Sequence, residues 1–230
     1  VAIATTPDDL VRLNAKQKKA IYLGVENGYP IGYDMSRVWQ YYNLGARYIT
    51  LCHGANNQIC DSSTDPTGAL HNGLSDFGRQ LVAEMNRIGM MIDVSHISDS
   101  AFYDVLHLSK APVIASHSSV RSICDHPRNL TDDMIIRLAE NGGVVQINAL
   151  SSYVKTPEPN PERDSAIAEI RSRYGSYDQM TPKKRDEFRK EYLVLKEKYK
   201  ESMASVSDFV DHIDYVVDLV GIDYVGIGMD

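Results

Sequence analysis

Five apolar, strand-like segments of the sequence each end on a side chain that can bind a metal ion or transfer a proton. The segments AIYLGVE, YITLCH, MMIDVSH, PVIASH and YVGIGMD end on Glu26, His53, His96, His117 and Asp230, respectively. In parallel α/β folds, catalytic residues gather at the carboxyl ends of the strands. The sequence therefore predicts that these five side chains point into one site.

Imidazole and carboxylate groups together suit zinc or a similar hydrolytic metal. His96 and His117 are one strand–helix–strand step apart, which places both rings at the same end of adjacent strands, and Glu26 adds a carboxylate at another strand end. The serines beside the histidines in DVSHIS and ASHSS could hydrogen-bond the rings and fix their tautomers. Taken singly, each histidine could instead be a hydrogen-bonded core or loop residue, and Glu26 a helix-capping or salt-bridged residue.

Other polar residues could act on a substrate. Asp230 follows the small-residue strand GIGMD, and its carboxylate could take a proton from metal-bound water and return it to a leaving amine. Arg128, in DHPRN, could clamp a substrate carboxylate, but a surface arginine in a turn fits the spacing equally well. His53 precedes a long polar loop and could hydrogen-bond a substrate oxygen. The remaining histidines are interpreted as structural or solvated: His71, His107, His126 and His212.

Helix and strand patterns that alternate along the chain would position these residues. Six strand-like runs, almost continuously apolar, lie near residues 20–26, 47–53, 90–96, 112–117, 143–149 and 224–229. Such runs are typical of parallel strands covered on both faces. We predict an α/β fold, a TIM-like (β/α)8 barrel with about six of its eight strands, as a single incomplete domain over residues 1–230.

Capping patterns mark the ends of the intervening helices. Ser75, Ser98 and Thr131 precede amphipathic segments and are predicted N-caps, whereas Gly45 and Gly89 are predicted to stop helices. The pair at residues 142–143 is a further predicted stop before the strand VVQINAL.

The regular alternation is interrupted between about residues 155 and 205. This segment begins with three prolines and continues as the highly charged, helix-favouring KKRDEFRKEYLVLKEKYKE. We predict a charged helical insertion, for which a solvated role stabilised by local charge pairs is favoured over a lid or a subunit contact.

Bulk composition limits the partners of the chain. The 230 residues carry a formal charge of −7, which argues against a nucleic-acid partner. The three cysteines do not form a disulfide framework; Cys52 and Cys60 could pair, but buried free thiols are favoured for both and for Cys124.

Both ends of the sequence resemble interior parts of a domain, so we expect a piece of a longer polypeptide. The protein would be exported (periplasmic or cell-envelope) or cytoplasmic, according to any signal upstream of Val1.

The motifs together resemble the membrane dipeptidase, or renal dipeptidase, family. The segments that carry the resemblance are GVENGYPI, LGARYITLCH, HNGLSDFGRQLVAEMNRIGMMIDVSHIS, APVIASHSS, CDHPRNLTDDM and DHIDYVVDLVGIDYVGIGMD, at residues 20–154 and 208–230. The resemblance implies a (β/α)8 barrel of the metal-dependent hydrolase type with two Zn²⁺ ions, which hydrolyses the peptide bond of dipeptides by a zinc-activated water. Some members accept a D-configured second residue or open certain β-lactams.

Residue roles follow from the same resemblance. Glu26 resembles the carboxylate that bridges both zinc ions, and His96 and His117 resemble the ligands of one of them. Asp230 resembles the acid/base aspartate. The resemblance further implies that substrate is held at three positions: His53 near the scissile carbonyl oxygen, and Arg128 and Tyr153 near the carboxylate. It also implies a homodimer and a membrane or lipid anchor outside this chain.

Three departures from the family pattern keep alternatives open. The family's His-x-Asp ligand pair on the first strand has no counterpart here, and the chain stops at Asp230 where the family continues. Near the predicted bridging residue the family has Glu-Gly-Gly-His, but this chain has Glu26, Asn27, Gly28 and Tyr29, so its substrate preference could differ. The alternatives are a hydrolase of N-acyl amino acids or related amides, and a non-catalytic fragment or pseudo-enzyme.

Overall fold

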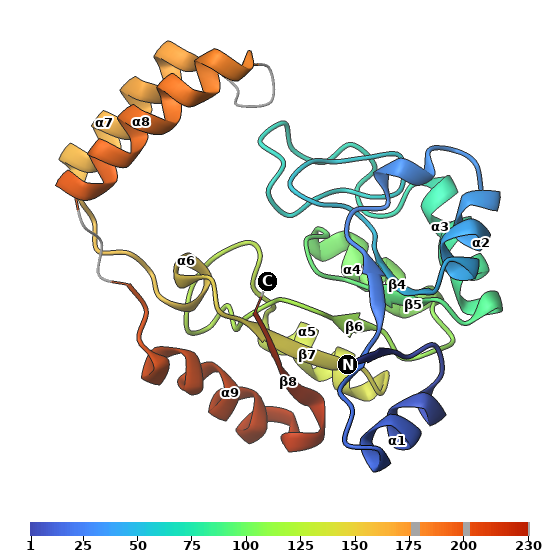
Figure 1. Ribbon diagram of the computed structural model, residues 1–230. Coiled ribbons are helices and arrows are strands. Elements are labelled where there is room, and N and C mark those ends of the chain that lie inside the picture. The colour runs from blue at the N-terminus through green and yellow to red at the C-terminus, as the bar shows by residue number, and fades with distance from the viewer. Residues whose placement is uncertain (176–179, 200–202, 230) are drawn as a thin grey trace.

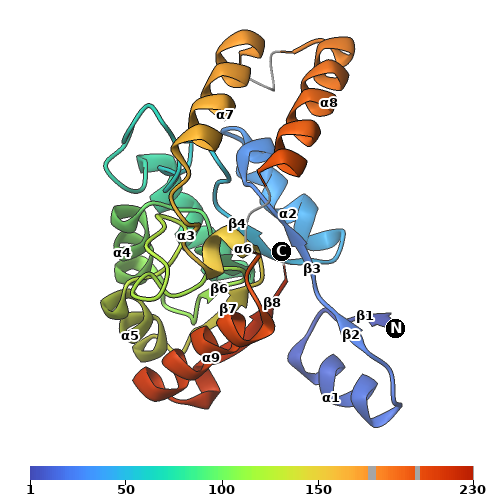
Figure 2. The ribbon, with the colours of Figure 1, turned by 90° about the vertical axis from the view of Figure 1, so that its left-hand side faces the viewer.

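The computed structural model describes residues 1–175, 180–199 and 203–229 and has an α/β architecture (Figure 1). Its main sheet is six-stranded and entirely parallel, and its spatial order follows the order of the chain. The strands are β3 (Leu23–Val25), β4 (Ala46–Thr50), β5 (Met91–Asp93), β6 (Ile114–Ala115), β7 (Val144–Asn148) and β8 (Val225–Gly228). The sheet curls like part of a barrel, with β3 and β8 at its two edges (Figures 1 and 2).

Helices cover the outer face of this sheet, one after nearly every strand (Figure 2). They are α2 (Ser36–Asn43), α3 (Asp76–Ile88), α4 (Asp99–Leu108), α5 (Asp132–Glu140) and α9 (Val206–Val220). Their apolar faces and the strands form one continuous buried core, which includes Ile49, Leu81, Phe102, Leu138 and Val216. Short helical turns complete the chain: η1 (Tyr29–Ile31), α6 (Ser151–Val154) and η3 (Ile222–Tyr224).

The predicted helix ends are confirmed at the atomic level. The hydroxyls of Ser75, Ser98 and Thr131 each accept a hydrogen bond from a backbone N–H in the first turn of α3, α4 and α5, respectively. Gly89 ends α3 in the left-handed conformation, with φ of 79°, and Gly45 follows α2 with φ of 102°. These caps satisfy backbone groups that a helix leaves unpaired at its ends.

The predicted strand over residues 20–26 is in fact two strands. β2 (Ala20–Ile21) pairs with β1 (Ala2–Ile3) in a separate two-stranded sheet beside α1 (Pro7–Ala15), whereas β3 pairs with β4. The register of β3 against β4 shifts between Leu23 and Gly24. Gly24 lies against the Tyr48 ring so closely that a Cβ atom there would come within 2.0 Å of it. A residue with a Cβ atom at position 24 would therefore clash with the Tyr48 ring in this arrangement of β3 and β4.

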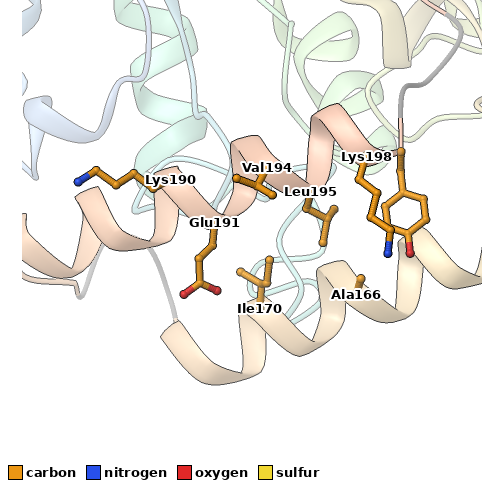
Figure 3. Close-up of a pocket in the computed structure, with 8 residues that line it drawn as sticks. Ala166, Ile170, Lys190, Glu191, Val194, Leu195 and Lys198 are labelled. Carbon is orange, nitrogen blue, oxygen red and sulfur yellow. The ribbon is translucent and has the colours of Figure 1, made fainter.

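Two long helices, α7 (Pro161–Tyr174) and α8 (Pro182–Lys198), form an arm that stands away from the rest of the chain (Figures 1 and 2). Their helical character agrees with the composition of the charged segment. The ion pair of Arg173 with Glu191, at 2.9 Å, links the two helices. Ile170 and Leu195 line a shallow pocket between them (Figure 3). Val194 of α8 is 71% exposed. The role of the arm as a solvated insertion, lid or subunit contact stays a prediction.

Other features of the chain are simpler. Cys52, Cys60 and Cys124 are buried free thiols, which confirms the favoured interpretation. None of the helices in the described ranges is both long and apolar enough to cross a membrane.

Candidate metal centre

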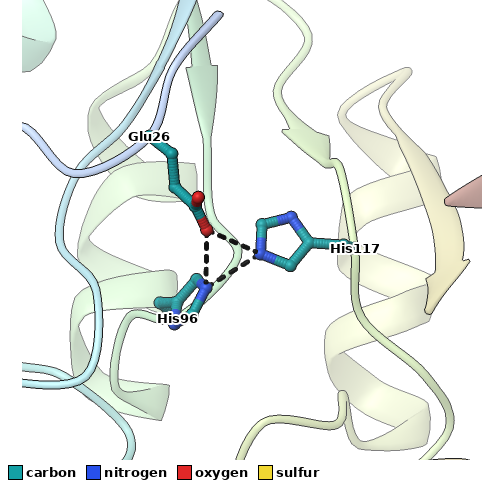
Figure 4. Close-up of side chains that lie close together, drawn as sticks. All are labelled: Glu26, His96 and His117. Atoms are coloured by element: carbon teal, nitrogen blue, oxygen red, sulfur yellow. Dashed lines mark hydrogen bonds and ion pairs between the residues drawn. The ribbon is translucent and has the colours of Figure 1, made fainter. Parts of the chain in front are cut away.

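Glu26, His96 and His117 converge on one point at the carboxyl edge of the sheet (Figure 4). Glu26 Oε1 lies 3.2 Å from His96 Nε2 and 3.4 Å from His117 Nε2, and the two Nε2 atoms are 2.8 Å apart. The three residues follow β3, β5 and β6, so parallel strands bring their side chains together from distant parts of the sequence. Among the described residues they form a group that could hold a metal ion.

The backbone at His96 aims its ring into the site. His96 has φ of 74°, in the left-handed region that non-glycine residues rarely occupy. Its carbonyl accepts a hydrogen bond from the Ser63 N–H at 2.8 Å, which ties this turn to the polar loop after β4. Such backbone strain is typical of functional sites.

His96 is held in its neutral form. Burial lowers the pKa of His96 to about 2, and the positive charge of Arg128 acts in the same direction. At neutral pH the imidazole therefore keeps a nitrogen lone pair that can bind a cation. Its buried Nδ1 has no hydrogen-bond partner in the described part of the chain.

His117 is held differently, by the side chains around it. Its Nδ1 lies 2.7 Å from Ser116 Oγ, and its backbone N–H donates to Ser95 Oγ at 3.0 Å. Ser116 Oγ in turn donates to Asp93 Oδ2 at 2.6 Å. The expectation that serines beside the histidines hydrogen-bond a ring thus holds for Ser116 and His117.

His53 lies at the exposed side of the group. Its Nε2 is 3.9 Å from Glu26 Oε1, and its ring centroid is 4.3 Å from that of His96. The His53 side chain is 56% exposed. With Asn27, Tyr29 and Asn57 it lines an open pocket next to the three converging residues. This position lets a bound molecule touch His53 and the candidate metal position together.

Arg128 and Tyr153 lie together on the other side of His117. Arg128 is 4% exposed, and its Nη2 donates to the His117 carbonyl at 3.1 Å. The guanidinium carbon lies 5.6 Å from the centroid of the Tyr153 ring. Asn129 fixes the pair, because its Nδ2 donates to the Tyr153 carbonyl at 2.8 Å. The interpretation of Arg128 as a surface arginine is therefore wrong.

Asp230 lies outside the described residues. The strand that leads to it, β8, pairs with β7 through Gly228 opposite Asn148. A Cβ atom at Gly228 would lie 2.4 Å from the Ser116 carbonyl, so glycine is needed where β8 passes the carboxyl end of β6. A second pocket between the sheet edges is lined by Glu26, His117 and Gly228.

Two of the remaining histidines, His212 and His71, make hydrogen bonds within the chain that fit a structural role, whereas the interpretation of His107 and His126 stays a prediction. His212 is fully buried; it accepts from the Val120 N–H at Nδ1, 3.0 Å away, and its Nε2 lies 2.9 Å from the Val154 carbonyl. His71 Nε2 lies 2.8 Å from the Asn57 carbonyl.

Two residues behind the site, Asp93 and Thr50, were not singled out from the sequence. Both are fully buried, and Thr50 Oγ1 donates to Asp93 Oδ2 at 2.5 Å. The sequence did contain one signal for Asp93, which is an aspartate inside the apolar run MMIDVSH. An aspartate in a buried strand indicates a polar network, because a buried carboxylate requires hydrogen-bond donors around it.

Comparison with known proteins identifies the family of this chain. The model of the membrane dipeptidases, peptidase family M19, matches residues 1–230. The chain belongs to this family. It is 34% identical over 224 residues, 97% of its length, to an uncharacterized dipeptidase (C965.12) of Schizosaccharomyces pombe, of which the match covers 44%. It is also 43% identical over 138 residues to dipeptidase 3 of Macaca fascicularis, covering 59% of this chain and 28% of that protein.

Comparison with solved structures gives the same fold. The crystal structure of the probable dipeptidase PvdM from Pseudomonas aeruginosa matches 99% of this chain and 61% of its own, with a TM-score of 0.85 and 31% identity. This match confirms the TIM-like α/β fold class. The chain spans less than half the length of the two curated relatives named above.

Proposed function

We propose that this chain contributes the Glu26–His96–His117 site of a zinc-dependent dipeptidase, which hydrolyses the peptide bond of dipeptides. The observation that supports this most is the approach of Glu26 Oε1 to both imidazole Nε2 atoms, within 3.4 Å, in a chain of the membrane dipeptidase family. Metallopeptidase chemistry requires such a group of ligands at one end of the barrel.

The donor set fits zinc. Ligand atoms about 2.0–2.2 Å from a tetrahedral zinc ion lie roughly 3.3–3.5 Å apart. The separations of Glu26 Oε1 from the two Nε2 atoms, 3.2 and 3.4 Å, are close to this value, whereas the two Nε2 atoms, 2.8 Å apart, would have to move apart to bind one ion. The neutral form of His96 leaves its lone pair available, and a carboxylate with two imidazoles is a common zinc environment. When bound, zinc would polarise a carbonyl and lower the pKa of a water molecule.

The residues around the metal position would orient the dipeptide. Arg128 and Tyr153 would bind the free carboxylate of the substrate, since a guanidinium pairs with a carboxylate in a planar, two-bond geometry. His53 would hydrogen-bond the scissile carbonyl oxygen, as its position 3.9 Å from Glu26 Oε1 allows. Asp230 would carry the proton from the attacking water to the leaving amine.

A second zinc ion is part of this proposal for the complete protein, with Glu26 as the shared ligand. The remaining ligands of that ion would come from outside this chain. A homodimer and a membrane or lipid anchor outside the chain, implied by the family resemblance, are proposed on the same basis. Two alternatives stay open: hydrolysis of N-acyl amino acids, which would use the same Arg128–Tyr153 pair, and a chain without catalytic activity.

Metal content and turnover test the proposal. The gene product and this 230-residue chain would be analysed for bound zinc and for hydrolysis of a panel of dipeptides and N-acyl amino acids. We expect two zinc ions and dipeptide turnover in the complete protein, both reduced in His117→Ala and retained in His107→Ala, whose histidine is exposed on α4. Turnover of acyl amino acids alone would favour that alternative, and absence of metal from the complete protein would refute both enzymatic functions.

A further inference from the structure

The carboxylate of Asp93 is the end of a hydrogen-bonded chain that starts at the His117 ring. Asp93 is fully buried at the end of β5. Its Oδ1 accepts from the backbone N–H groups of Ser95 at 3.0 Å and Ser116 at 2.9 Å. Its Oδ2 accepts from the hydroxyls of Thr50 at 2.5 Å and Ser116 at 2.6 Å. Four donors thus surround this carboxylate.

The position of every proton along this chain can be assigned. A carboxylate accepts hydrogen bonds and donates none, so the single hydroxyl proton of Ser116 points to Asp93. Ser116 Oγ can then only accept at its 2.7 Å contact with His117 Nδ1, so Nδ1 must carry the ring proton. His117 Nε2 is left with its lone pair directed at Glu26 and His96.

We propose that Asp93 and Ser116 are positioning residues that hold His117 in the Nδ1–H tautomer, with Nε2 free to bind the metal. The inference rests on the proposed function, because it assigns to His117 the role of a ligand. It adds two residues that act on the metal position through His117. Orienting groups of this kind fix the tautomer and ring direction of metal-binding histidines.

The chain of contacts also couples three neighbouring strands. Thr50 ends β4, Asp93 ends β5, and Ser116 follows β6, so the carboxylate joins the carboxyl ends of all three. His96 has no equivalent support, since its Nδ1 has no partner among the described residues and its backbone conformation aims the ring instead. The two histidines are therefore oriented by different means, and only His117 should respond to loss of the Ser116 hydroxyl.

Ring nitrogen chemical shifts provide a direct test in the complete protein after metal removal. With ¹⁵N-labelled histidine and the His117 signals assigned by their loss in His117→Gln, we expect Nδ1 to be protonated and Nε2 unprotonated in the natural sequence. Protonation at Nε2 of His117 in the natural sequence would overturn the proposal without any need for a positioning variant. This measurement requires neither activity nor bound metal. It therefore tests the tautomer of His117 even if the proposed function is wrong.

A set of serine variants separates positioning from packing. Ser116→Ala removes the hydroxyl, and we expect a mixture of His117 tautomers and a zinc affinity reduced about 10–100-fold, measured by competition with a chelator. Ser116→Thr restores a hydroxyl at a position that borders a pocket. It should recover the tautomer and most of the affinity.

The matched control is Ser122→Ala, which removes a serine hydroxyl that donates to Asp132 at 2.7 Å on the exposed surface. It should leave the tautomer and zinc affinity unchanged. An unchanged tautomer in a folded Ser116→Ala protein, or an equal loss in Ser116→Thr, would overturn the proposal. If the natural protein binds no zinc but His117 shows the Nδ1–H tautomer that Ser116→Ala loses, the positioning would stand and the proposed function would fail.

Discussion

Arg128 donates a hydrogen bond from Nη2 to the backbone carbonyl of His117, across 3.1 Å, in a region where Arg128 is 4% exposed. This hydrogen bond fixes the Arg128 guanidinium relative to the backbone that carries the His117 imidazole. If Arg128 binds a substrate carboxylate, the distance between that carboxylate and the metal position is set by one short segment of chain. A substrate of fixed length, such as a dipeptide, suits this arrangement.

Replacement of Arg128 by lysine should weaken substrate binding. Lysine keeps the positive charge but cannot make two parallel hydrogen bonds or hold the His117 carbonyl in the same way. We expect kcat/KM for dipeptides to fall about 10–100-fold, corresponding to the roughly 1.5–3 kcal/mol of a hydrogen bond to a charged group. Steady-state kinetics on the complete protein measure this, with Arg137→Lys, on the exposed face of α5, as the control. Equal losses in both variants would contradict the assigned role.

Replacement of Glu26 by glutamine should reduce metal binding without unfolding the protein. The amide keeps the size of the side chain but removes the negative charge that lies 3.2 Å from His96 Nε2. The Glu26 side chain is 49% exposed, so its loss of charge should change the unfolding free energy by less than about 0.5 kcal/mol. We expect metal affinity to fall at least tenfold, measured by chelator competition. Glu140→Gln, at the exposed end of α5, should bind metal normally.

Acid should destabilise the fold through His212. Burial lowers the pKa of His212, against smaller opposing effects of the Val154 carbonyl, Asp211 and Asp208. Because the unfolded chain then binds the proton more tightly than the folded one, this contribution to stability is present above about pH 6.5. It is lost as the pH falls from there through the lowered pKa, since the protonated ring can no longer accept from the Val120 N–H.

The comparison that isolates this effect is His212→Asn, which retains an acceptor and a donor but does not titrate. At pH 7.5 we expect the natural protein to be more stable by about 1–3 kcal/mol, the usual cost of disturbing buried hydrogen bonds. The difference should narrow at pH 5.5, measured by denaturant unfolding. A difference that is constant with pH would show that His212 does not titrate in this range.

The spacing of β6 and β7 depends on Gly143. A Cβ atom there would lie 2.3 Å from the Val113 carbonyl oxygen, a backbone atom that cannot move without displacing β6 and the His117 that follows it. Gly143→Ala should therefore destabilise the protein by about 1–3 kcal/mol, as expected for overpacking. Gly54→Ala is the control, because nothing lies within 4 Å of the added atom. Thermal unfolding of both variants compares them directly.

Much of the fold and of the candidate site follows from local patterns in the sequence. Strands that end on His96 and His117 were predictable because apolar runs and capping residues such as Ser98 and Thr131 act over a few positions. The division of residues 20–26 was not, since it depends on long-range pairing: β2 pairs with β1, and β3 pairs with β4. The contact of Ser116 with the His117 ring was predictable from the adjacent serine, but the partners of Asp93 were not, because Asp93 acquires them only when three strands align.

The left-handed backbone of His96 determines which substitutions at position 96 would stabilise the protein. A φ of 74° costs a histidine roughly 1–2 kcal/mol more than glycine, which adopts it without a Cβ clash. Glycine at this position would relax the backbone while it deleted the imidazole. A screen for thermal resistance and a screen for metal binding would therefore favour different residues at position 96.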